Sequence, residues 1–177
     1  MTGARRTGEN GATALEHLMV AHQRQVLMTA LRITGNMQDA QGASQEVFFR
    51  LFRHQARLDP DREVGPWLYR VTVNVCLDLL RKRPHLGLES APEPRDANPG
   101  PEAAMDLDGR RSLLHRALQR LPEKERAALV LREIEGLSTR EVAEALGSSE
   151  TTVRSQISTA RARLREICTG LMQRRRT

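Results

Sequence analysis

Hydrophobic residues recur three or four positions apart through most of the chain, and this spacing predicts helices. No segment shows the alternation of apolar and polar residues that marks a half-buried strand. Glycine, asparagine and proline mark the expected breaks, at Gly35 and Asn36, in the polar segment 54–65, and at Pro84. We therefore expect an all-α fold, with helices at about 13–33, 37–57, 66–83 and 105–120, another from about 122, and two more after residue 136.

The segment 136–164 carries two helix starts separated by a glycine turn. Ser138 and Glu141 have the spacing of a capping box, and Gly147 suits the left-handed conformation that ends a short helix. Ser149 is a second N-cap, before a helix that continues to Ile167. The second helix has one apolar stripe, formed by Val153, Ile157, Ala160 and Leu164.

A short capped helix, a turn and a second helix with a polar outer face is the arrangement of a DNA-binding helix-turn-helix. Hydroxyl and guanidinium groups on the second helix can contact base edges and phosphates in the major groove. These groups belong to Thr151, Arg154, Ser155, Ser158, Thr159 and Arg161. The alternative is an ordinary helical hairpin with solvated arginines, and this stretch alone favours DNA binding over it.

The expected helix 66–83 is the second informative stretch. Trp67, Tyr69, Arg70 and Asn74 gather near its start, and the basic run 81–83 ends it. Aromatic rings beside arginines can stack on unpaired bases while the cations hold the phosphate backbone. The alternative, that the aromatic residues anchor the core and the basic run complements the helix dipole, is favoured when this stretch is taken alone.

The expected helix 37–57 is predicted to bury some of Ala40, Ala43, Val47, Leu51 and Phe52, and its adjacent aromatic residues give a further prediction. Phe48 and Phe49 cannot share one face of a helix, so one of them is expected to point outward.

The composition favours an anionic partner, and the distribution of charge and proline divides the chain into two domains and a linker. The 28 basic and 22 acidic residues give a net charge of +6, which favours nucleic acid. The proline-rich segment 84–104 is instead acidic, with net charge −3, and predicts a flexible linker between two small helical domains. The expected organisation is a disordered tail (1–12), a first domain (13–84), the linker (85–104), a second domain (105–170) and a basic tail (171–177).

Few residues suggest catalysis. Cys76 and Cys168 lie far apart in sequence, and the five histidines are scattered. We expect no metal, no cofactor and no catalytic site, so a nucleic-acid enzyme that uses Cys76 or a histidine is disfavoured. The N-terminal segment has no apolar run, which predicts a cytoplasmic protein without membrane insertion.

The order of motifs resembles a bacterial extracytoplasmic function (ECF) sigma factor. The motifs are WLYRVTVNVCLDLLRKR, then an acidic proline-rich linker, then LPEKER and GLSTREVAEALGSSETTVRS. The resemblance covers nearly the whole chain. It implies a non-enzymatic subunit that binds the clamp and flap of core RNA polymerase, and promoter DNA that is double-stranded at the -35 element and single-stranded at the -10 element. It also implies an anti-sigma factor as a partner, and a linker that mimics RNA.

The resemblance assigns residues to three surfaces. Those implied for the -35 element are Thr152, Arg154, Ser155, Ser158, Thr159 and Arg161. Those implied for binding and melting the -10 element are Trp67, Arg70, Asn74, Arg81, Lys82 and Arg83, beside a loop that accepts a flipped base. Those implied for the polymerase clamp are Asp39, Gln45, Glu46, Phe48 and Phe49.

Two departures from the family pattern keep an alternative open. Gln41 and Gly42 stand where the family usually has acidic residues, and Ser158 and Thr159 stand where an aromatic residue or histidine followed by arginine is frequent. The altered 39–46 segment is the support for the alternative, a helix-turn-helix transcriptional regulator that does not recruit polymerase. The retained 67–83 motif argues against it, because a reader of duplex DNA does not need that helix.

Overall fold

A computed structural model describes residues 6–54, 64–83 and 102–174, and these residues are almost entirely helical, with no strand among them. The all-α prediction is confirmed. The helices are α1 (Arg6–Thr34), α2 (Met37–His54), α3 (Val64–Lys82), α4 (Glu102–Gln119), α5 (Glu123–Leu129), the π-helical turn η2 (Val130–Ile134), α6 (Thr139–Leu146) and α7 (Glu150–Arg174). No helix of the described part is long and apolar enough to cross a membrane.

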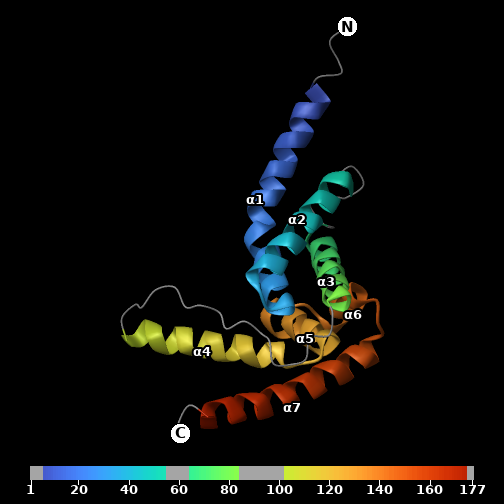
Figure 1. Ribbon diagram of the computed structural model, residues 1–177. Coiled ribbons are helices and arrows are strands. Elements are labelled where there is room, and N and C mark those ends of the chain that lie inside the picture. The colour runs from blue at the N-terminus through green and yellow to red at the C-terminus, as the bar shows by residue number, and fades with distance from the viewer. Residues whose placement is uncertain (1–5, 55–63, 84–101, 175–177) are drawn as a thin grey trace.

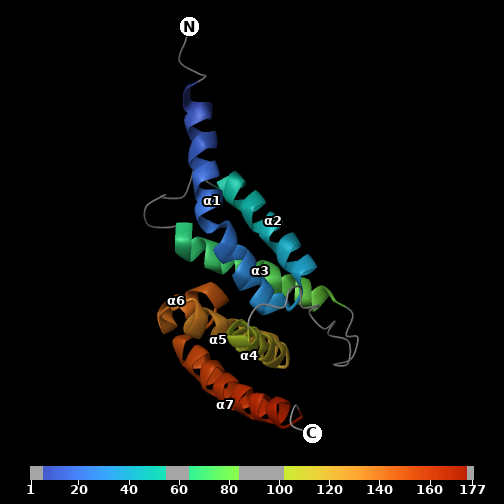
Figure 2. The same ribbon diagram turned by 90° about the vertical axis from the view of Figure 1, so that its left-hand side faces the viewer.

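The helices form two bundles in contact, as both ribbon views show (Figures 1 and 2). The N-terminal bundle consists of α1, α2 and α3, and the first half of α1 projects beyond it. The C-terminal bundle consists of α4 to α7, with α7 on the side away from α1. Val47 and Leu51 of α2 pack with Ile33 and Leu68 at the centre of the N-terminal bundle, where all four are essentially buried.

The local signals around the helix-turn-helix are confirmed. Ser138 Oγ accepts from the Glu141 amide and the Glu141 carboxylate accepts from the Ser138 amide, which completes the capping box of α6. Gly147 ends α6 at φ 58°. Ser149 Oγ then accepts from the Thr152 amide at 3.1 Å and starts α7.

Helix ends differ from the predicted ones. α1 begins at Arg6, although we expected disorder up to residue 12. The helix extends further because each residue added to an existing helix costs little compared with nucleation. α4 begins at Glu102, inside the expected linker, and α7 continues through Arg174 of the expected basic tail. The rest of both tails, the linker from 84 to 101 and the loop 55–63 lie outside the described residues.

The π-helical turn η2 was not predicted. Its extra residue rotates the following side chains by about 100° relative to an α-helix. Ile134 follows Val130 and Leu131 at helical spacing, so a regular helix would bury it with them; it is instead 38% exposed, while the Glu135 side chain is only 10% exposed. The turn thus places a carboxylate where periodicity predicted an aliphatic side chain.

The two bundles share one hydrophobic core, although the sequence predicted two domains on a flexible tether. α3 shows this most clearly. Leu68, Val71 and Val75 share one face of the helix by their spacing and are buried, but Thr72 and Val73 are buried as well. The additional burial arises because α3 packs on α6 of the C-terminal bundle as well as on α1 and α2.

Candidate nucleic-acid and protein interfaces

The outer face of α7 presents every side chain that the sequence placed there. Val153, Ile157 and Ala160 are buried against the bundle, so the opposite side faces solvent. Exposed on that side are Thr152, Arg154, Ser155, Ser158, Thr159 and Arg161. Two of these pair with carboxylates, Arg154 with Glu150 at 2.7 Å and Arg161 with Glu133 at 2.5 Å. Such exposed pairs contribute little stability, so both guanidinium groups can change partners readily.

A polar stripe runs along α3. Arg70, Asn74 and Arg81 are exposed and lie at spacings of four and seven residues, which places them on one side of the helix. Lys82 and Arg83 are exposed at its end. Trp67 begins the stripe but is half-buried, and its ring lies 6.0 Å from the His54 ring of α2. Trp67 therefore also contributes to the packing between α2 and α3.

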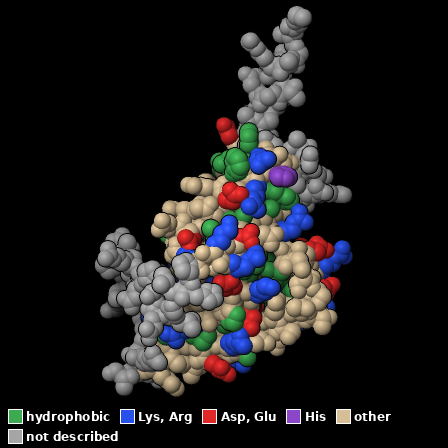
Figure 3. Space-filling view, turned by 45° about the vertical axis from the view of Figure 1, so that its right-hand side comes forward, with side chains coloured by type: hydrophobic (Ala, Val, Ile, Leu, Met, Phe, Trp, Pro, Cys, Tyr) green, Lys and Arg blue, Asp and Glu red, His purple; other side chains and the backbone are tan. Residues whose placement is uncertain are grey.

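A groove of about 730 Å³ lies between α1 and α2, and we call it the α1–α2 groove. It is lined by Met19, Gln23, Leu27, Gln41, Ser44, Gln45, Phe48, Phe49 and Phe52. Phe49 is 55% exposed and Phe48 half-buried, which confirms that one of the two points outward. The Arg53 guanidinium lies 5.8 Å from the centre of the Phe49 ring. Exposed hydrophobic side chains also gather at the upper end of the molecule in Figure 3, the end where α2 finishes.

The structure gathers only some of the residues assigned to the polymerase clamp. Gln45, Phe48 and Phe49 line the α1–α2 groove, but Asp39 and Glu46 do not. Asn36 caps the start of α2, because its Oδ1 accepts from the Asp39 amide and its Nδ2 donates to the Asp39 carboxylate. Asp39 also pairs with Arg83, which directly follows α3, while Glu46 pairs with Arg50. We had placed Phe52 among the possible core residues of α2, yet it is 57% exposed at the groove.

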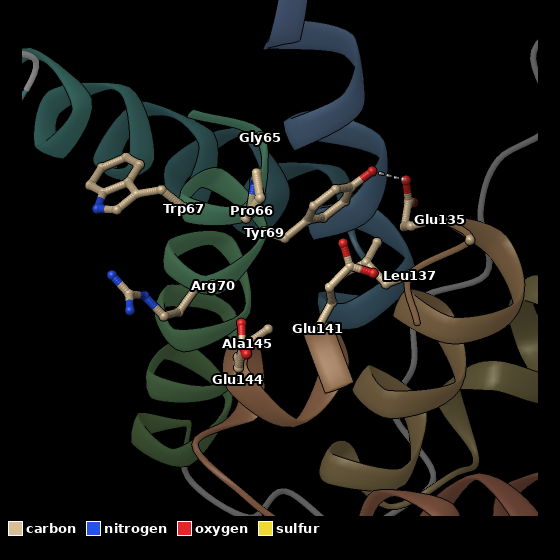
Figure 4. A pocket seen from close by; sticks show the side chains of 11 residues that line it. Gly65, Pro66, Trp67, Tyr69, Arg70, Glu135, Leu137, Glu141, Glu144 and Ala145 are labelled. Atoms are coloured by element: carbon tan, nitrogen blue, oxygen red, sulfur yellow. Dashed lines mark hydrogen bonds between the residues drawn. The ribbon is translucent and has the colours of Figure 1, made fainter. Parts of the chain in front are cut away.

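A cavity of about 580 Å³ separates the start of α3 from α6 (Figure 4). Trp67 and Arg70 point to its outer rim, whereas Tyr69 points inward to Glu135. Glu135 accepts hydrogen bonds from Thr29, Arg32 and Tyr69, and we call these four residues the Glu135 cluster. Burial, and next the charge of Glu135, raise the pKa of Tyr69 to about 12, so its hydroxyl remains a donor.

Cys76 lacks the environment of a reactive thiol. It is buried in the shared core, and burial raises its pKa to about 12. A thiol with such a pKa is not a nucleophile at neutral pH. Cys76 is therefore a packing residue of α3.

Two family models match the chain, in the order of the two bundles. Residues 18–85 match sigma-70 region 2, and residues 111–164 match sigma-70 region 4. The first match therefore covers α2, α3 and most of α1, and the second covers the helix-turn-helix with the helices before it.

Similar proteins of known function are sigma factors. The ECF sigma factor SigE of Mycolicibacterium smegmatis is 38% identical over 165 residues, which span 90% of this chain and 64% of SigE. RNA polymerase sigma-H factor of Pseudomonas aeruginosa is 32% identical over 159 residues, which span 84% of this chain and 82% of that protein. ECF sigma factor SigM of Mycobacterium tuberculosis is 34% identical over 154 residues, which span 85% of this chain and 75% of SigM.

Solved structures show the same fold. CnrH, in complex with the cytosolic domain of CnrY, has a TM-score of 0.64 at 25% identity, over 90% of this chain and 95% of CnrH. RpoE of Bartonella quintana, in complex with the anti-sigma factor NepR, has a TM-score of 0.70 at 20% identity, over 87% of this chain and 96% of RpoE. With both sigma-70 regions present in order on this fold, the chain belongs to the ECF sigma factors of bacterial RNA polymerase.

Proposed function

We propose that the protein directs core RNA polymerase to a set of promoters by binding the -35 element through α7. The observation that carries this proposal is that all six predicted -35 side chains are exposed on one side of α7. The capped α6 and the glycine at residue 147 hold α7 at a fixed angle, as a helix-turn-helix requires. Ser158 and Thr159 supply hydroxyl groups where an aromatic residue or histidine followed by arginine is frequent in the family, so the preferred -35 sequence is expected to differ from the common one.

The -10 element is proposed to bind along the polar stripe of α3. Arg70, Asn74 and Arg81 would contact one strand as the duplex opens, and Trp67 would stack at the start of the stripe. Stacking and backbone contacts offset the cost of removing bases from the duplex. The loop that would accept a flipped base lies mainly in residues 55–63, outside the described part.

The α1–α2 groove is the proposed docking site for the polymerase clamp. Its aromatic side chains and bordering glutamines match the resemblance-based assignment at Gln45, Phe48 and Phe49. We propose that the protein acts in the cytoplasm, where the polymerase works, and contributes no catalytic group. An anti-sigma factor is a further proposed partner, supported by the family and by the complex of RpoE with NepR.

Co-elution with bacterial core RNA polymerase tests the proposed function. The protein is expected to co-elute, and Gln41→Glu/Gly42→Asp is expected to increase retention by restoring the family's acidic residues. A Cβ added at Gly42 meets no atom within 4 Å, so the position is open to a side chain. Gly42→Ala is the matched control, because it improves helix propensity by about 1 kcal/mol without adding charge.

The outcomes of the co-elution experiment are distinct. Retention that rises with the acidic pair but not with Gly42→Ala would assign the effect to charge. Failure of every version to co-elute, with duplex DNA still bound, would instead identify a regulator that does not recruit polymerase.

Arg154→Ala is expected to weaken use of a -35-dependent promoter by about 1–3 kcal/mol of binding, which is roughly 5- to 150-fold. The reason is that Arg154 lies in the first turns of α7, the part of a recognition helix that contacts base edges. Promoter occupancy by the holoenzyme is the measurement. Arg165→Ala, which removes the same charge from the exposed second half of α7, is the control. Unchanged promoter selection and occupancy in Arg154→Ala would refute the assignment.

A further inference from the structure

α7 begins with an acidic residue, Glu150, at the end of the helix that is proposed to enter the major groove. Its Oε2 accepts from Arg154 Nη2 at 2.7 Å, and the Glu150 and Arg154 side chains are 43% and 65% exposed. An ion pair this exposed contributes little stability. A carboxylate in this position also repels the phosphates of DNA. Glu150 therefore weakens binding to DNA unless its carboxylate takes part in recognition.

The first turn of α7 is held in a defined orientation. Ser149 Oγ accepts from the Thr152 amide at 3.1 Å and lies 2.8 Å from the Thr152 hydroxyl oxygen, so one side chain both caps the helix and fixes a neighbouring hydroxyl group. Val153 is completely buried, which fixes the rotation of α7 about its axis. Glu150 and Arg154 are four residues apart and therefore project side by side from this turn. Side chains held in this way can distinguish bases, because recognition requires a fixed geometry.

Arg140 of α6 is close enough to sense the charge of Glu150. Its hydrogen bond to Glu144, the charge of Glu144 and then the charge of Glu150 all raise the pKa of Arg140. Two guanidinium groups, those of Arg140 and Arg154, therefore act on Glu150. They partly offset the repulsion between its carboxylate and the phosphates of DNA, which makes a carboxylate tolerable at this surface.

Arg154 keeps one edge of its side chain available for a base. A guanidinium has five N–H groups, and in Arg154 only one of them, on Nη2, donates to a described residue. The others include two parallel donors, the arrangement that matches O6 and N7 of guanine in the major groove. The bond to Glu150 reduces the number of orientations that the guanidinium samples, which lowers the entropic cost of binding. Guanine is therefore the base that Arg154 is best placed to bind.

Glu150 keeps one acceptor oxygen available as well. Its Oε2 is bonded to Arg154, whereas no described residue donates to its Oε1. An ionised carboxylate only accepts hydrogen bonds, and its characteristic partner in the major groove is the N4 amino group of cytosine. Thymine presents the O4 acceptor and a methyl group instead, so Glu150 would repel a thymine at the same place. The carboxylate therefore favours one base and opposes another.

We propose that Glu150 is a specificity-determining residue, through which α7 selects a -35 element with a cytosine in the base pair next to the guanine that Arg154 binds. The proposal deepens the proposed function and rests on it, because it concerns the bases that α7 recognises. Arg154 donates two hydrogen bonds to the guanine, and Glu150 accepts one from N4 of the cytosine. The carboxylate lowers affinity for every sequence by repelling phosphates, and the cytosine contact restores affinity only at the correct site. Glu150 therefore increases discrimination more than affinity.

Glu150→Gln tests the proposal, since it keeps the length of the side chain but removes its charge. Holoenzyme reconstituted with bacterial core RNA polymerase selects DNA from a promoter library randomised over both elements. The unaltered protein is expected to enrich a guanine with a cytosine in the adjacent base pair, and to bind the selected sequence about tenfold more tightly than its cytosine-to-thymine variant. In Glu150→Gln this ratio is expected to fall to about twofold or less, because glutamine can also donate to the thymine O4.

Glu144→Gln is the matched control, because it breaks an ion pair of the same spacing on the neighbouring helix. Glu144 pairs with Arg140 at 3.0 Å, and the two side chains are 62% and 79% exposed. The control removes the same charge from α6 rather than from the start of α7. It is expected to leave the preference for cytosine unchanged.

A purely structural role of Glu150 gives a different result. An acidic residue in the first turn also stabilises a helix through its dipole. Loss of that effect alone would lower the melting temperature and weaken binding to all sequences equally, with the preference for cytosine intact. That result overturns the proposal, as does an equal loss of preference in Glu144→Gln, or an enriched -35 sequence without an adjacent guanine and cytosine. If holoenzyme forms but enriches no -35 sequence, the proposed recognition by α7 is itself wrong.

Discussion

Replacing Phe49 and Phe52 together by alanine is expected to weaken binding to core RNA polymerase by roughly 100- to 1,000-fold. The two rings are 55% and 57% exposed and line the same groove. Exposed aromatic side chains at a protein interface commonly contribute about 2 kcal/mol or more each, and their effects are not fully additive. Equilibrium titration of labelled protein with core polymerase measures the change.

Stability should barely change in the same variant, since substitutions at exposed positions usually alter it by no more than about 0.5 kcal/mol. This separates a lost contact with polymerase from a damaged fold. Met172→Ala is the control, because it removes a 50% exposed hydrophobic side chain from α7, far along the chain from the groove. A loss of affinity below about fivefold, or 1 kcal/mol, would show that the clamp binds elsewhere.

Local signals in the sequence were sufficient for most of the fold. The capping box of Ser138 and Glu141 and the left-handed Gly147 depend on groups within a few residues of one another, and all are present as predicted. The exposed face of α7 also followed from sequence, because the apolar stripe fixes which side is buried. The roles of the exposed residues in binding DNA stay predictions.

Features that arise between the bundles were not predictable from local patterns. Thr72 and Val73 are buried because α3 packs against α6, a contact between segments that the sequence assigns to separate domains. Glu135 reaches α1 only because the π-helical turn changes the phase of its helix. Neither the turn nor the contact leaves a periodic signal, since periodicity assumes regular helices and a single core for each domain.

The exposure of Phe52 could have been predicted from the sequence, but we predicted burial instead. Phe49 and Phe52 are three residues apart, so they share one face of α2. One of Phe48 and Phe49 must point outward. If Phe49 does so, Phe52 must point outward with it, because the two share a face. The buried set of Ala40, Ala43, Val47 and Leu51 already forms a complete stripe, which leaves Phe52 outside it.

Gly35→Ala is expected to lower the free energy of unfolding by about 2–3 kcal/mol, of which strain at positive φ supplies roughly 1–2 and a lost hydrogen bond about 1. Gly35 has φ +84°, and an added Cβ would lie 2.3 Å from Gln119 Oε1. Gln119 would have to move away, and its bond to the Arg32 carbonyl would be lost. Urea unfolding measures the change, and a decrease of roughly 5–10 °C in the melting temperature should accompany it.

Substitutions at two other glycines distinguish backbone strain from the clash with Gln119 as causes of that loss. Gly136 has φ +77° but no neighbour within 4 Å of an added Cβ, so Gly136→Ala carries the strain without the clash and should cost only about 1–2 kcal/mol. Gly42→Ala lies in an open helical position and should stabilise by up to about 1 kcal/mol. The difference between Gly35→Ala and Gly136→Ala therefore measures the contact between α1 and α4. If the two variants lose equal stability, the Gln119 contact contributes nothing measurable to holding the bundles together.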